Sequence, residues 1–290
     1  MTSASPSPLT TRELRRVPAL VPLYARAVLP GSGGGGPLPR RELVVTARAD
    51  GARVRRYAGV CGFPPSGPLP PTHPHLVAFP LAMELMAARD FPFPLLGLVH
   101  LANEVECARP LAPGEALTYR VRTGDRVGHP RGTAFRMLAE ASDGNGVVVW
   151  RSTSTYLRRG RPTGEAPGEA LPEVEHPERT ERWRLPASTG RAYAAVSGDR
   201  NPIHLYALTA RLLGFPRAIA HGMWTKARAL AALADVLPDA CRVTVDFRAP
   251  VLLPGRAEFS AVAHGDGHAF AVRSADGTRE HLRGRVSPLR

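Results

Sequence analysis

The feature that most constrains the fold is an internal repetition. Three landmarks occur in the same order in both halves of the 290-residue chain: a Tyr-Ala-x-Val-x-Gly segment, an apolar helix-like run, and a strand that leads into a Pro-Gly turn. Chance rarely produces three such agreements, so we predict two similar units in tandem. In the first and second half respectively, the landmarks are Tyr57–Gly62 and Tyr193–Gly198, Ala78–Ala88 and Ala218–Leu233, and Val105–Gly114 and Val245–Gly255.

Each Pro-Gly turn is followed by three stretches in which β-branched and apolar residues favour strands. One central helix followed by several antiparallel strands is an α+β pattern, and a curved antiparallel sheet wrapped around the helix would satisfy it. The stretches are Leu117–Arg122, Phe135–Ala141 and Val147–Leu157 in the first half, and Ala257–His264, Ala269–Arg273 and His281–Val286 in the second.

Proline and glycine mark two joints in the chain. Segment Arg158–Arg179 is rich in Pro, Gly and Glu and has no periodic apolar pattern, which indicates a linker. We therefore predict an N-terminal unit over residues 1–160, a linker over 161–178 and a C-terminal unit over 179–290. Gly31–Pro39 reads as a second flexible segment.

Composition excludes several classes of protein. The net charge of +13 comes almost entirely from arginines that are scattered, with few interleaved aromatics, so nucleic-acid binding is not expected. No apolar run approaches the roughly 18 residues of a membrane-spanning helix, and no secretory signal is evident, so we expect no membrane association. The cysteines, Cys61, Cys107 and Cys241, form no CxxC pair, which argues against a disulfide framework or a zinc site and favours a cytoplasmic location.

The stretch Tyr193–Met223 carries the candidate chemistry. Asp199 and His204 lie five residues apart, and Pro202 should keep the chain between them extended or turned, so both side chains can point at one site. Such a pair can orient and deprotonate water. Further on, Gly222 stands where a helix should begin, and a helix N-terminus offers backbone N–H groups to a developing oxyanion.

This stretch resembles the hydratase-2 signature of the MaoC-like dehydratases, the family of (R)-specific enoyl-CoA hydratases, in its double-hotdog form. The signature reads Y-x-x-x-S-G-D-x-N-P-I-H, then A-x-x-x-G-F, then I-x-H-G-M. The matching residues are Ser197, Gly198, Asp199, Asn201, Pro202, Ile203, His204, Ala210, Gly214, Phe215, Ile219, His221, Gly222 and Met223.

The resemblance implies a hotdog fold in each half and reversible hydration of trans-2-enoyl thioesters to (3R)-3-hydroxyacyl thioesters. Asp199 and His204 would hold the water, and the Gly222 N–H would polarise the thioester carbonyl. No metal or redox cofactor is implied; CoA or an acyl-carrier protein is part of the substrate. Where many family members have an acidic residue and a proline after the motif histidine, this chain has Leu205-Tyr206-Ala207, which predicts altered substrate contacts.

The other motif residues are interpreted as structural or supporting. Asn201 should brace the loop, Ser197 could serve loop hydrogen bonding or support the site, and His221 is read as structural. Met223 is assigned to substrate binding or loop support. Tyr193 is read as a core or loop anchor.

The first half lacks the catalytic residues. Phe63 replaces Asp199, no Asn-Pro-Ile-His follows, and Leu81-Ala82-Met83 aligns with His221-Gly222-Met223. We predict a degenerate hotdog that accommodates the acyl chain, with Phe63 and Ala82 affecting chain length. His73 and His75 stand in a Pro-rich stretch without an acidic partner.

Two other functions stay open at this point. One is a non-catalytic acyl-thioester binding protein of the same fold, against which the intact Asp199 and His204 argue. The other is a hotdog thioesterase, which would need a carboxylate on the central helix; the second-half helix has none before Asp235. Association of two chains into a homodimer also stays open.

Overall fold

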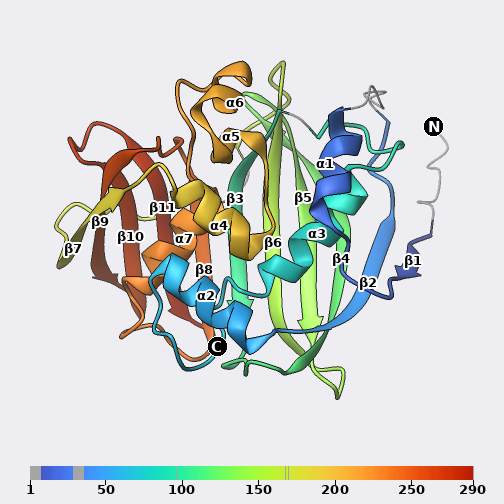
Figure 1. Cartoon of the computed structure of the whole chain (residues 1–290), viewed down its shortest axis with the longest axis horizontal. Helices are drawn as coiled ribbons and strands as arrows, with labels where there is room; N and C mark the ends of the chain where they lie inside the picture. Colours follow the sequence, from blue (N-terminus) through green and yellow to red (C-terminus); the bar gives the residue numbers. More distant parts are fainter. Residues whose placement is uncertain (1–7, 29–35, 96, 167, 169, 290) are drawn as a thin grey trace.

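The computed structural model describes residues 8–28, 36–95, 97–166, 168 and 170–289. The predicted flexible segment 31–39 therefore lies outside the described residues as far as residue 35. Within the described part, the strands form one 11-stranded sheet, and the helices lie on one face of it (Figure 1). The strands are β1 (Thr10–Glu13), β2 (Arg41–Arg48), β3 (Leu98–Cys107), β4 (Ala116–His129), β5 (Gly132–Ser142), β6 (Val148–Arg159), β7 (Arg179–Leu185), β8 (Cys241–Phe247), β9 (Gly255–His264), β10 (Gly267–Ser274) and β11 (Glu280–Pro288).

The strand order is β1-β2-β4-β5-β6-β3-β8-β11-β10-β9-β7. Apart from β1, which pairs with β2 in parallel, the second half repeats the order of the first in reverse. The halves meet at β3 and β8, which pair antiparallel with Val105 opposite Val243. The predicted α+β double hotdog is confirmed, with the addition that backbone hydrogen bonds join its two sheets into one.

The described helices are α1 (Leu20–Val28), α2 (Gly51–Cys61), α3 (His75–Met86), α4 (Thr189–Ser197), α5 (Pro202–Leu205), α6 (Ala207–Leu212) and α7 (Gly222–Ala231). Helix α3 packs on β2, β4 and β5, while α7 packs on β10, so each half has a central helix. Helices α2 and α4 pack side by side where the halves meet. Their apolar side chains join those of α3 and α7 in one continuous core.

The repeated Tyr-Ala-x-Val-x-Gly segments, to which we assigned no helix from the sequence, form the C-terminal ends of two helices. They close α2 and α4, and each helix stops at a glycine in the left-handed conformation, Gly62 with φ 86° and Gly198 with φ 82°. Other residues rarely adopt this conformation, so the repeated glycine is a helix C-cap. Helix α2 also has an N-cap, because the Asp50 carboxylate accepts from the Arg53 N–H at 2.9 Å.

The alignment of Leu81-Ala82-Met83 with His221-Gly222-Met223 was also wrong. Helix α7 begins at Gly222, but α3 already begins at His75, so Ala82 lies in the second half of its helix. The Pro-rich segment before α3 is shorter than the segment before α7 that carries Asp199 and His204, and alignment by a shared methionine hid this difference.

The predicted linker contains no helix or strand among its described residues 161–166, 168 and 170–178, yet it is packed against both half-sheets. The Thr163 N–H donates to the His129 carbonyl at 3.1 Å. Further on, Val174 is buried against Ala269 and Ala271. The linker is therefore packed against the sheet in both halves.

Candidate active site

One cavity of about 850 Å³ opens between the two halves of the molecule. All seven residues predicted for the site line it, and they come from the end of α4, the following loop, α5 and the start of α7. They are Ser197, Asp199, Asn201, His204, His221, Gly222 and Met223. The structure therefore brings every sequence-predicted site residue to one place.

The loop that carries Asp199 is fixed by its own hydrogen bonds. The Ser197 hydroxyl donates to the Tyr193 carbonyl at 2.8 Å and accepts from the Asp199 N–H at 3.1 Å. The Asn201 N–H donates to Asp199 Oδ1 at 3.1 Å, and Asn201 caps α5 through its side chain. Ser197 and Asn201 thus hold the carboxylate in place, as the sequence indicated for Asn201.

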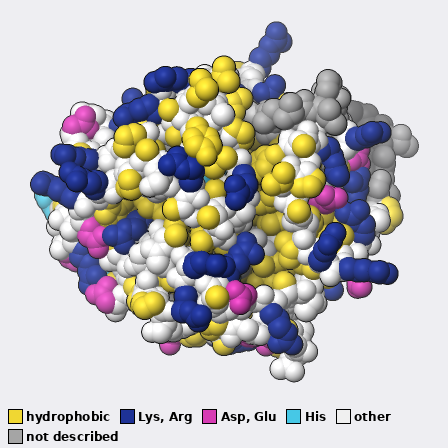
Figure 2. Space-filling view, viewed as in Figure 1, with side chains coloured by type: hydrophobic (Ala, Val, Ile, Leu, Met, Phe, Trp, Pro, Cys, Tyr) yellow, Lys and Arg dark blue, Asp and Glu magenta, His cyan; other side chains and the backbone are white. Residues whose placement is uncertain are grey.

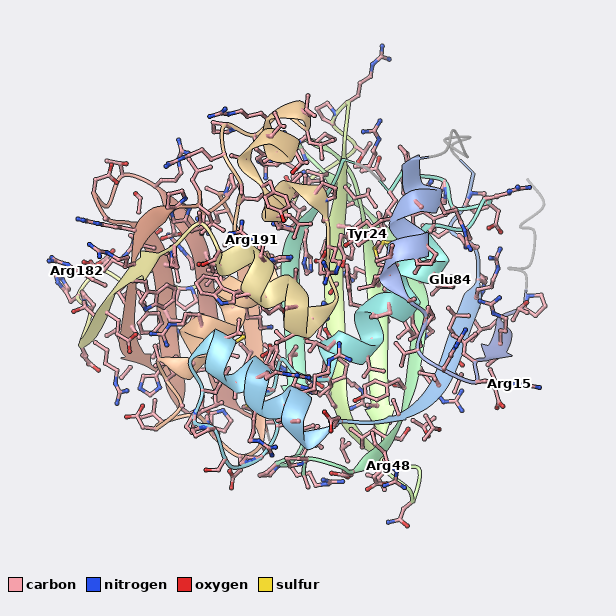
Figure 3. The ribbon with its side chains drawn as sticks, in the orientation of Figure 1. Arg15, Tyr24, Arg48, Glu84, Arg182 and Arg191 are labelled. Carbon is pink, nitrogen blue, oxygen red and sulfur yellow. The ribbon has the colours of Figure 1, made fainter. Side chains whose placement is uncertain are left out.

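Tyr24 supplies a contact that sequence reasoning missed. Its hydroxyl donates to Asp199 Oδ1, and its ring lines the cavity. Figure 3 shows Tyr24 pointing from α1 toward the centre of the molecule. Because α1 lies 175 residues before Asp199 and outside the repeat, no motif could connect the two.

His204 lies on α5, a one-turn helix that begins at Pro202, rather than in the extended loop that we expected. Proline suits the first position of a helix because that position needs no N–H partner. Gly190 of α4 allows the close packing: a Cβ there would lie 1.9 Å from the His204 carbonyl oxygen. Asn201 itself, with φ −54° and ψ 124°, lies outside the helical conformation, as predicted.

The hydrogen bonds of His204 set its tautomer. Its Nδ1 lies 2.8 Å from the Ile219 carbonyl oxygen, which only accepts, so Nδ1 carries the proton. Nε2 of the neutral ring then has a free lone pair. Burial and the neighbouring His221 lower the pKa of His204 to about 3, so the ring is neutral at physiological pH.

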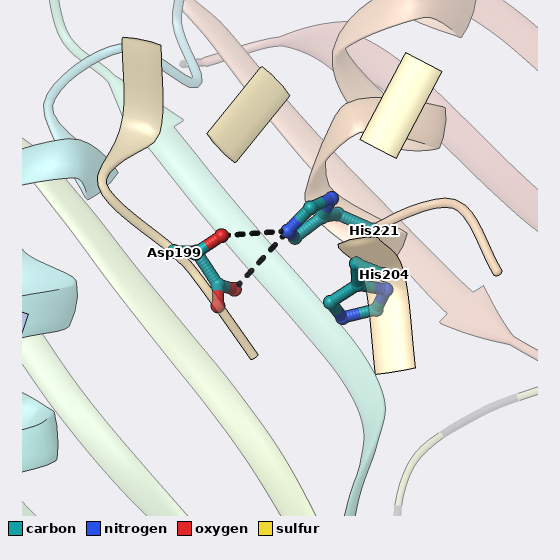
Figure 4. Close-up of side chains that lie close together, drawn as sticks. All are labelled: Asp199, His204 and His221. Atoms are coloured by element: carbon teal, nitrogen blue, oxygen red, sulfur yellow. Dashed lines mark hydrogen bonds and ion pairs between the residues drawn. The ribbon is translucent and has the colours of Figure 1, made fainter. Parts of the chain in front are cut away.

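His221 is the N-cap of α7 and braces the other two groups. Its Nε2 lies 3.0 Å from the Asp199 carbonyl oxygen and 3.8 Å from Asp199 Oδ2 (Figure 4). Its ring also stacks on that of His204, with 3.7 Å between centroids. Burial lowers the pKa of His221. These contacts agree with a supporting role for this residue.

The Asp199 carboxylate is kept ionised. Burial raises its pKa, but the neighbouring His221 and His204 and the hydrogen bonds from Tyr24 and the Asn201 N–H together bring it below the usual value. Near neutral pH the site therefore combines a carboxylate with a neutral imidazole that has a free lone pair. Both groups can accept a hydrogen bond from one water molecule.

Gly222 is the first residue of α7, so its N–H has no partner inside the helix. The positive end of the helix dipole lies at the same point. A Cβ on Gly222 would lie 3.1 Å from the Phe247 ring, so glycine allows Phe247 to pack closely against the start of α7 in the cavity wall. Met223 follows and is buried in the cavity wall.

The first half supplies an apolar part of the cavity wall. This part consists of Leu76, Phe79, Met83 and Met86 of α3, together with Leu95. Phe63 and Ala82, which we expected to affect chain length, do not line the cavity. The misplaced repeat alignment explains this error.

Three further polar rings of the first half, His75, His100 and Tyr156, also reach the cavity. His100 stacks on Tyr156 at 4.6 Å between centroids. Burial lowers the pKa of His75 to about 4 and that of His100 to about 3, so both are neutral. Sequence reasoning noticed His75 but placed it away from any acidic group, whereas in the structure it faces the same cavity as Asp199.

The donor atoms of Asp199, His204 and His221 lie within 4.8 Å of one another, which raises the question of a metal ion. However, His204 Nδ1 and His221 Nε2 already face backbone carbonyls, and Asp199 Oδ1 accepts from Tyr24 and Asn201. These contacts engage several of the atoms that a metal ion would need as ligands.

Known proteins share this sequence and architecture. The MaoC like domain family model matches residues 169–284. The 3-hydroxyacyl-thioester dehydratase X of Mycobacterium tuberculosis is 39% identical over 235 residues, covering 79% of this chain and 82% of the relative. The crystal structure of HtdX from the same organism matches with a TM-score of 0.73 at 34% identity, over 85% of this chain and 100% of that one. A MaoC-like dehydratase from Phytophthora capsici shares the fold, with a TM-score of 0.74 at 21% identity over 89% and 97% of the two chains. The chain belongs to the MaoC-like dehydratase family.

Proposed function

We propose that this protein is a hydro-lyase that interconverts trans-2-enoyl thioesters and (3R)-3-hydroxyacyl thioesters. The observation that carries the proposal is the pairing of an ionised Asp199 with a neutral His204 that has a free Nε2, both facing one cavity. The dehydratase name of the 39% identical relative supports the same reaction class.

In the hydration direction, Asp199 and His204 Nε2 would both accept hydrogen bonds from one water molecule. As its oxygen bonds to C3 of the enoyl group, one of the two takes up the water proton. The electron pair of the C2–C3 double bond moves toward the thioester carbonyl, and the same proton then reaches C2. Dehydration follows these steps in reverse, so one fixed pair serves both directions.

The negative charge that develops on the carbonyl oxygen needs a donor. The Gly222 N–H at the start of α7 would supply it, and one such donor contributes about 3–4 kcal/mol in other enzymes. The catalytic groups would approach the double bond from one face only, because the cavity wall fixes both on the α4–α7 side. This is the proposed origin of (3R) stereochemistry.

The contacts disfavour the two alternatives. A thioesterase would need a carboxylate on the central helix, and α7 contains none. A binding protein would not need an ionised carboxylate and a lone-pair imidazole on the same cavity. The substrate carries the CoA or carrier-protein group, and the proposed chemistry uses no metal or redox cofactor.

Crotonyl-CoA tests the proposal directly. We expect the ultraviolet absorbance of the enoyl thioester to fall without release of free thiol, because water adds across the double bond. The product should be the (3R) isomer by chiral chromatography. Activity should persist in EDTA. Thiol release would indicate a thioesterase, and binding without turnover would indicate a binding protein; either result would overturn the proposal.

A further inference from the structure

Exposed apolar side chains gather on α6, beside the mouth of the cavity. Tyr206, Leu208, Leu212 and Leu213 are 56%, 69%, 80% and 43% exposed, and we call these four residues the α6 patch. Figure 2 shows hydrophobic surface over α5 and α6. Leu208 and Leu212 lie one helical turn apart and therefore share a face. Leu213 also lines the cavity, so the patch is continuous with its opening.

The surface around the α6 patch is basic and almost free of acidic groups. Between Leu185 and Asp235 the sole acidic residue is Asp199, which faces the cavity. Four exposed arginines, Arg191, Arg200, Arg211 and Arg217, come from the same stretch. Within the described chain none of them pairs with a carboxylate; Arg191, Arg211 and Arg217 donate to backbone carbonyls.

The part of the cavity lining that comes from β6 and the β4–β5 turn is basic as well. Arg131, Arg158 and Arg159 are exposed and line the cavity, and none has an acidic partner among residues 8–28, 36–95, 97–166, 168 and 170–289. The sheet holds them together, because Arg159 pairs with Gly132, the neighbour of Arg131. Arg248, which also lines the cavity, differs, since it pairs with Asp246 and Glu280.

We propose that the α6 patch and the arginines around it dock an acidic carrier protein, which presents the acyl thioester to the cavity on its flexible arm. This inference rests on the proposed function and names the form of its substrate. Exposed apolar residues ringed by unpaired positive charge match an acidic surface with an apolar centre. CoA could meet the arginines of the cavity lining, but it would leave the leucines of α6 uncovered.

Charge complementarity also decides between the possible occupants. A second copy of this chain carries the same net charge of +13 and would bring arginines against arginines. An acidic carrier would instead pair with them. The bound arm would then reach the catalytic groups through the cavity that Leu213, Arg131 and Arg159 line.

The test compares a crotonyl group on a bacterial acyl-carrier protein with the same group on CoA. In Leu212→Glu and Arg211→Glu, kcat/KM for the carrier thioester should fall by about tenfold or more, because central apolar and charged contacts dominate such interfaces. Turnover of crotonyl-CoA should stay within about twofold of the wild type, as neither residue lines the cavity. Val147→Glu, at an apolar site 58% exposed on the β5–β6 turn, is the matched control and should change neither.

Each other outcome overturns the docking proposal. An equal loss with both substrates would mean that α6 supports the fold, and no loss with either would mean that the patch docks nothing. Wild-type turnover of crotonyl-CoA alone would leave the proposed function intact and remove the carrier. Loss of binding to anionic phospholipid vesicles, or of a dimer in Leu212→Glu, with unchanged carrier kinetics, would assign the patch to a membrane surface or to a second copy.

Discussion

The two oxygens of the Asp199 carboxylate have different surroundings. Oδ1 accepts from the Tyr24 hydroxyl and the Asn201 N–H, which fixes the carboxylate plane and favours its charged form. Oδ2 lies 3.8 Å from His221 Nε2 and is the oxygen left for water. Oδ1 therefore holds the carboxylate in place, while Oδ2 remains available to the proposed water molecule.

Removing either proposed catalytic group should abolish most of the activity. We expect Asp199→Asn and His204→Ala each to lower kcat for crotonyl-CoA hydration by at least about 100-fold, the usual contribution of an acid–base group. The fold should persist, which circular dichroism and thermal unfolding would show. Asp239→Asn, an exposed carboxylate, is the control. Near-normal turnover in a folded Asp199→Asn or His204→Ala variant would contradict the assignment.

Tyr24→Phe tests the contact from α1. A hydrogen bond to a charged group contributes about 1.5–3 kcal/mol, so we expect kcat to fall about tenfold or more with little change in KM. Because this bond lowers the pKa of Asp199, its loss should also move the acidic limb of the pH–rate profile to higher pH. Tyr206→Phe, assayed on crotonyl-CoA, is the control. A uniform loss at every pH would mean that Tyr24 only supports packing.

Which of the cavity residues could be predicted from the sequence depends on whether they belong to one motif. Asp199, His204 and Gly222 belong to one gapped motif, so a single stretch predicted them together. Tyr24, His75 and His100 come from the first half, and only the folded chain brings them to the cavity. Their own neighbours in sequence carry no signal of catalysis.

Among the elements, α3 and α7 occupy equivalent places and present different surfaces to the cavity. Helix α7 presents its N-cap His221 and its first residue Gly222, whereas α3 contributes Leu76, Phe79, Met83 and Met86. The residues predicted to be catalytic therefore lie on one half and an apolar part of the cavity wall on the other, and this wall does not include Phe63 or Ala82.

Phe79→Ala should widen the apolar part of the cavity. We expect the ratio of kcat/KM for C12 over C4 enoyl-CoA to rise, since each newly buried methylene contributes about 0.8 kcal/mol. Phe63→Ala, a half-buried aromatic of the same half that does not line the cavity, is the matched control and should leave the ratio unchanged. An unchanged ratio in Phe79→Ala would place the acyl tail elsewhere.

Lys226, the sole lysine, ties α7 to the joint between the half-sheets. It is fully buried, and its ammonium donates to the Asn103 carbonyl at 3.1 Å, Asn103 Oδ1 at 2.7 Å and the Val243 carbonyl at 3.2 Å. Asn103 stands on β3 and Val243 on β8, so one side chain bonds to both halves. Burial lowers the pKa of Lys226 to about 7.

Lys226→Met should lower the free energy of unfolding by about 3 kcal/mol, because it strands buried acceptors that cost about 1–3 kcal/mol each, while it also removes a buried charge. Urea unfolding would measure this. Arg228→Met on the same helix removes a partly exposed cation and should cost about 1 kcal/mol or less. A neutral or stabilising Lys226→Met would show that the burial of the charge outweighs its hydrogen bonds.

The ends of α2 and α4 could have been predicted only from their capping residues. Gly62 and Gly198 were visible as a repeat, but a short segment before a glycine fits a loop as well as a helix C-cap. Asp50, placed three residues before the N–H of Arg53, was the available signal for α2. The strands after each Pro-Gly turn were predicted well, because alternation of side chains survives in them.

At the scale of the whole molecule, repetition in the sequence predicted two units but not their joint. The β3–β8 pairing is made by backbone groups, so side chains carry no signal of it. Val105 and Val243, which face each other there, are typical of any buried strand. Residues of both halves line the cavity as a result of the β3–β8 pairing. Across the described residues, no helix is both long and apolar enough to span a membrane.

Buried histidines make the stability of the fold sensitive to acid. Burial lowers the pKa of four histidines: to about 4 for His73 and His75, and to about 3 for His100 and His204. Their unfolded values lie near 6.5, so between about pH 6.5 and 4 the unfolded chain binds protons that the folded chain excludes. The contribution of these four histidines to stability is therefore complete above pH 6.5 and is lost as the pH drops through this window.

We expect the free energy of unfolding, measured in urea at pH 7, 6 and 5, to fall as the pH drops, each such histidine contributing up to about 1.4 kcal/mol per pH unit within its window. His73→Phe offers a matched variant, because neither His73 ring nitrogen has a hydrogen-bond partner among the described residues and the ring packs edge-on against Tyr57, outside the cavity. This variant should unfold with a shallower pH dependence and keep its activity on crotonyl-CoA. A pH dependence identical to that of the wild type would mean that His73 is as easily protonated in the folded protein as in the unfolded chain, which its burial should prevent.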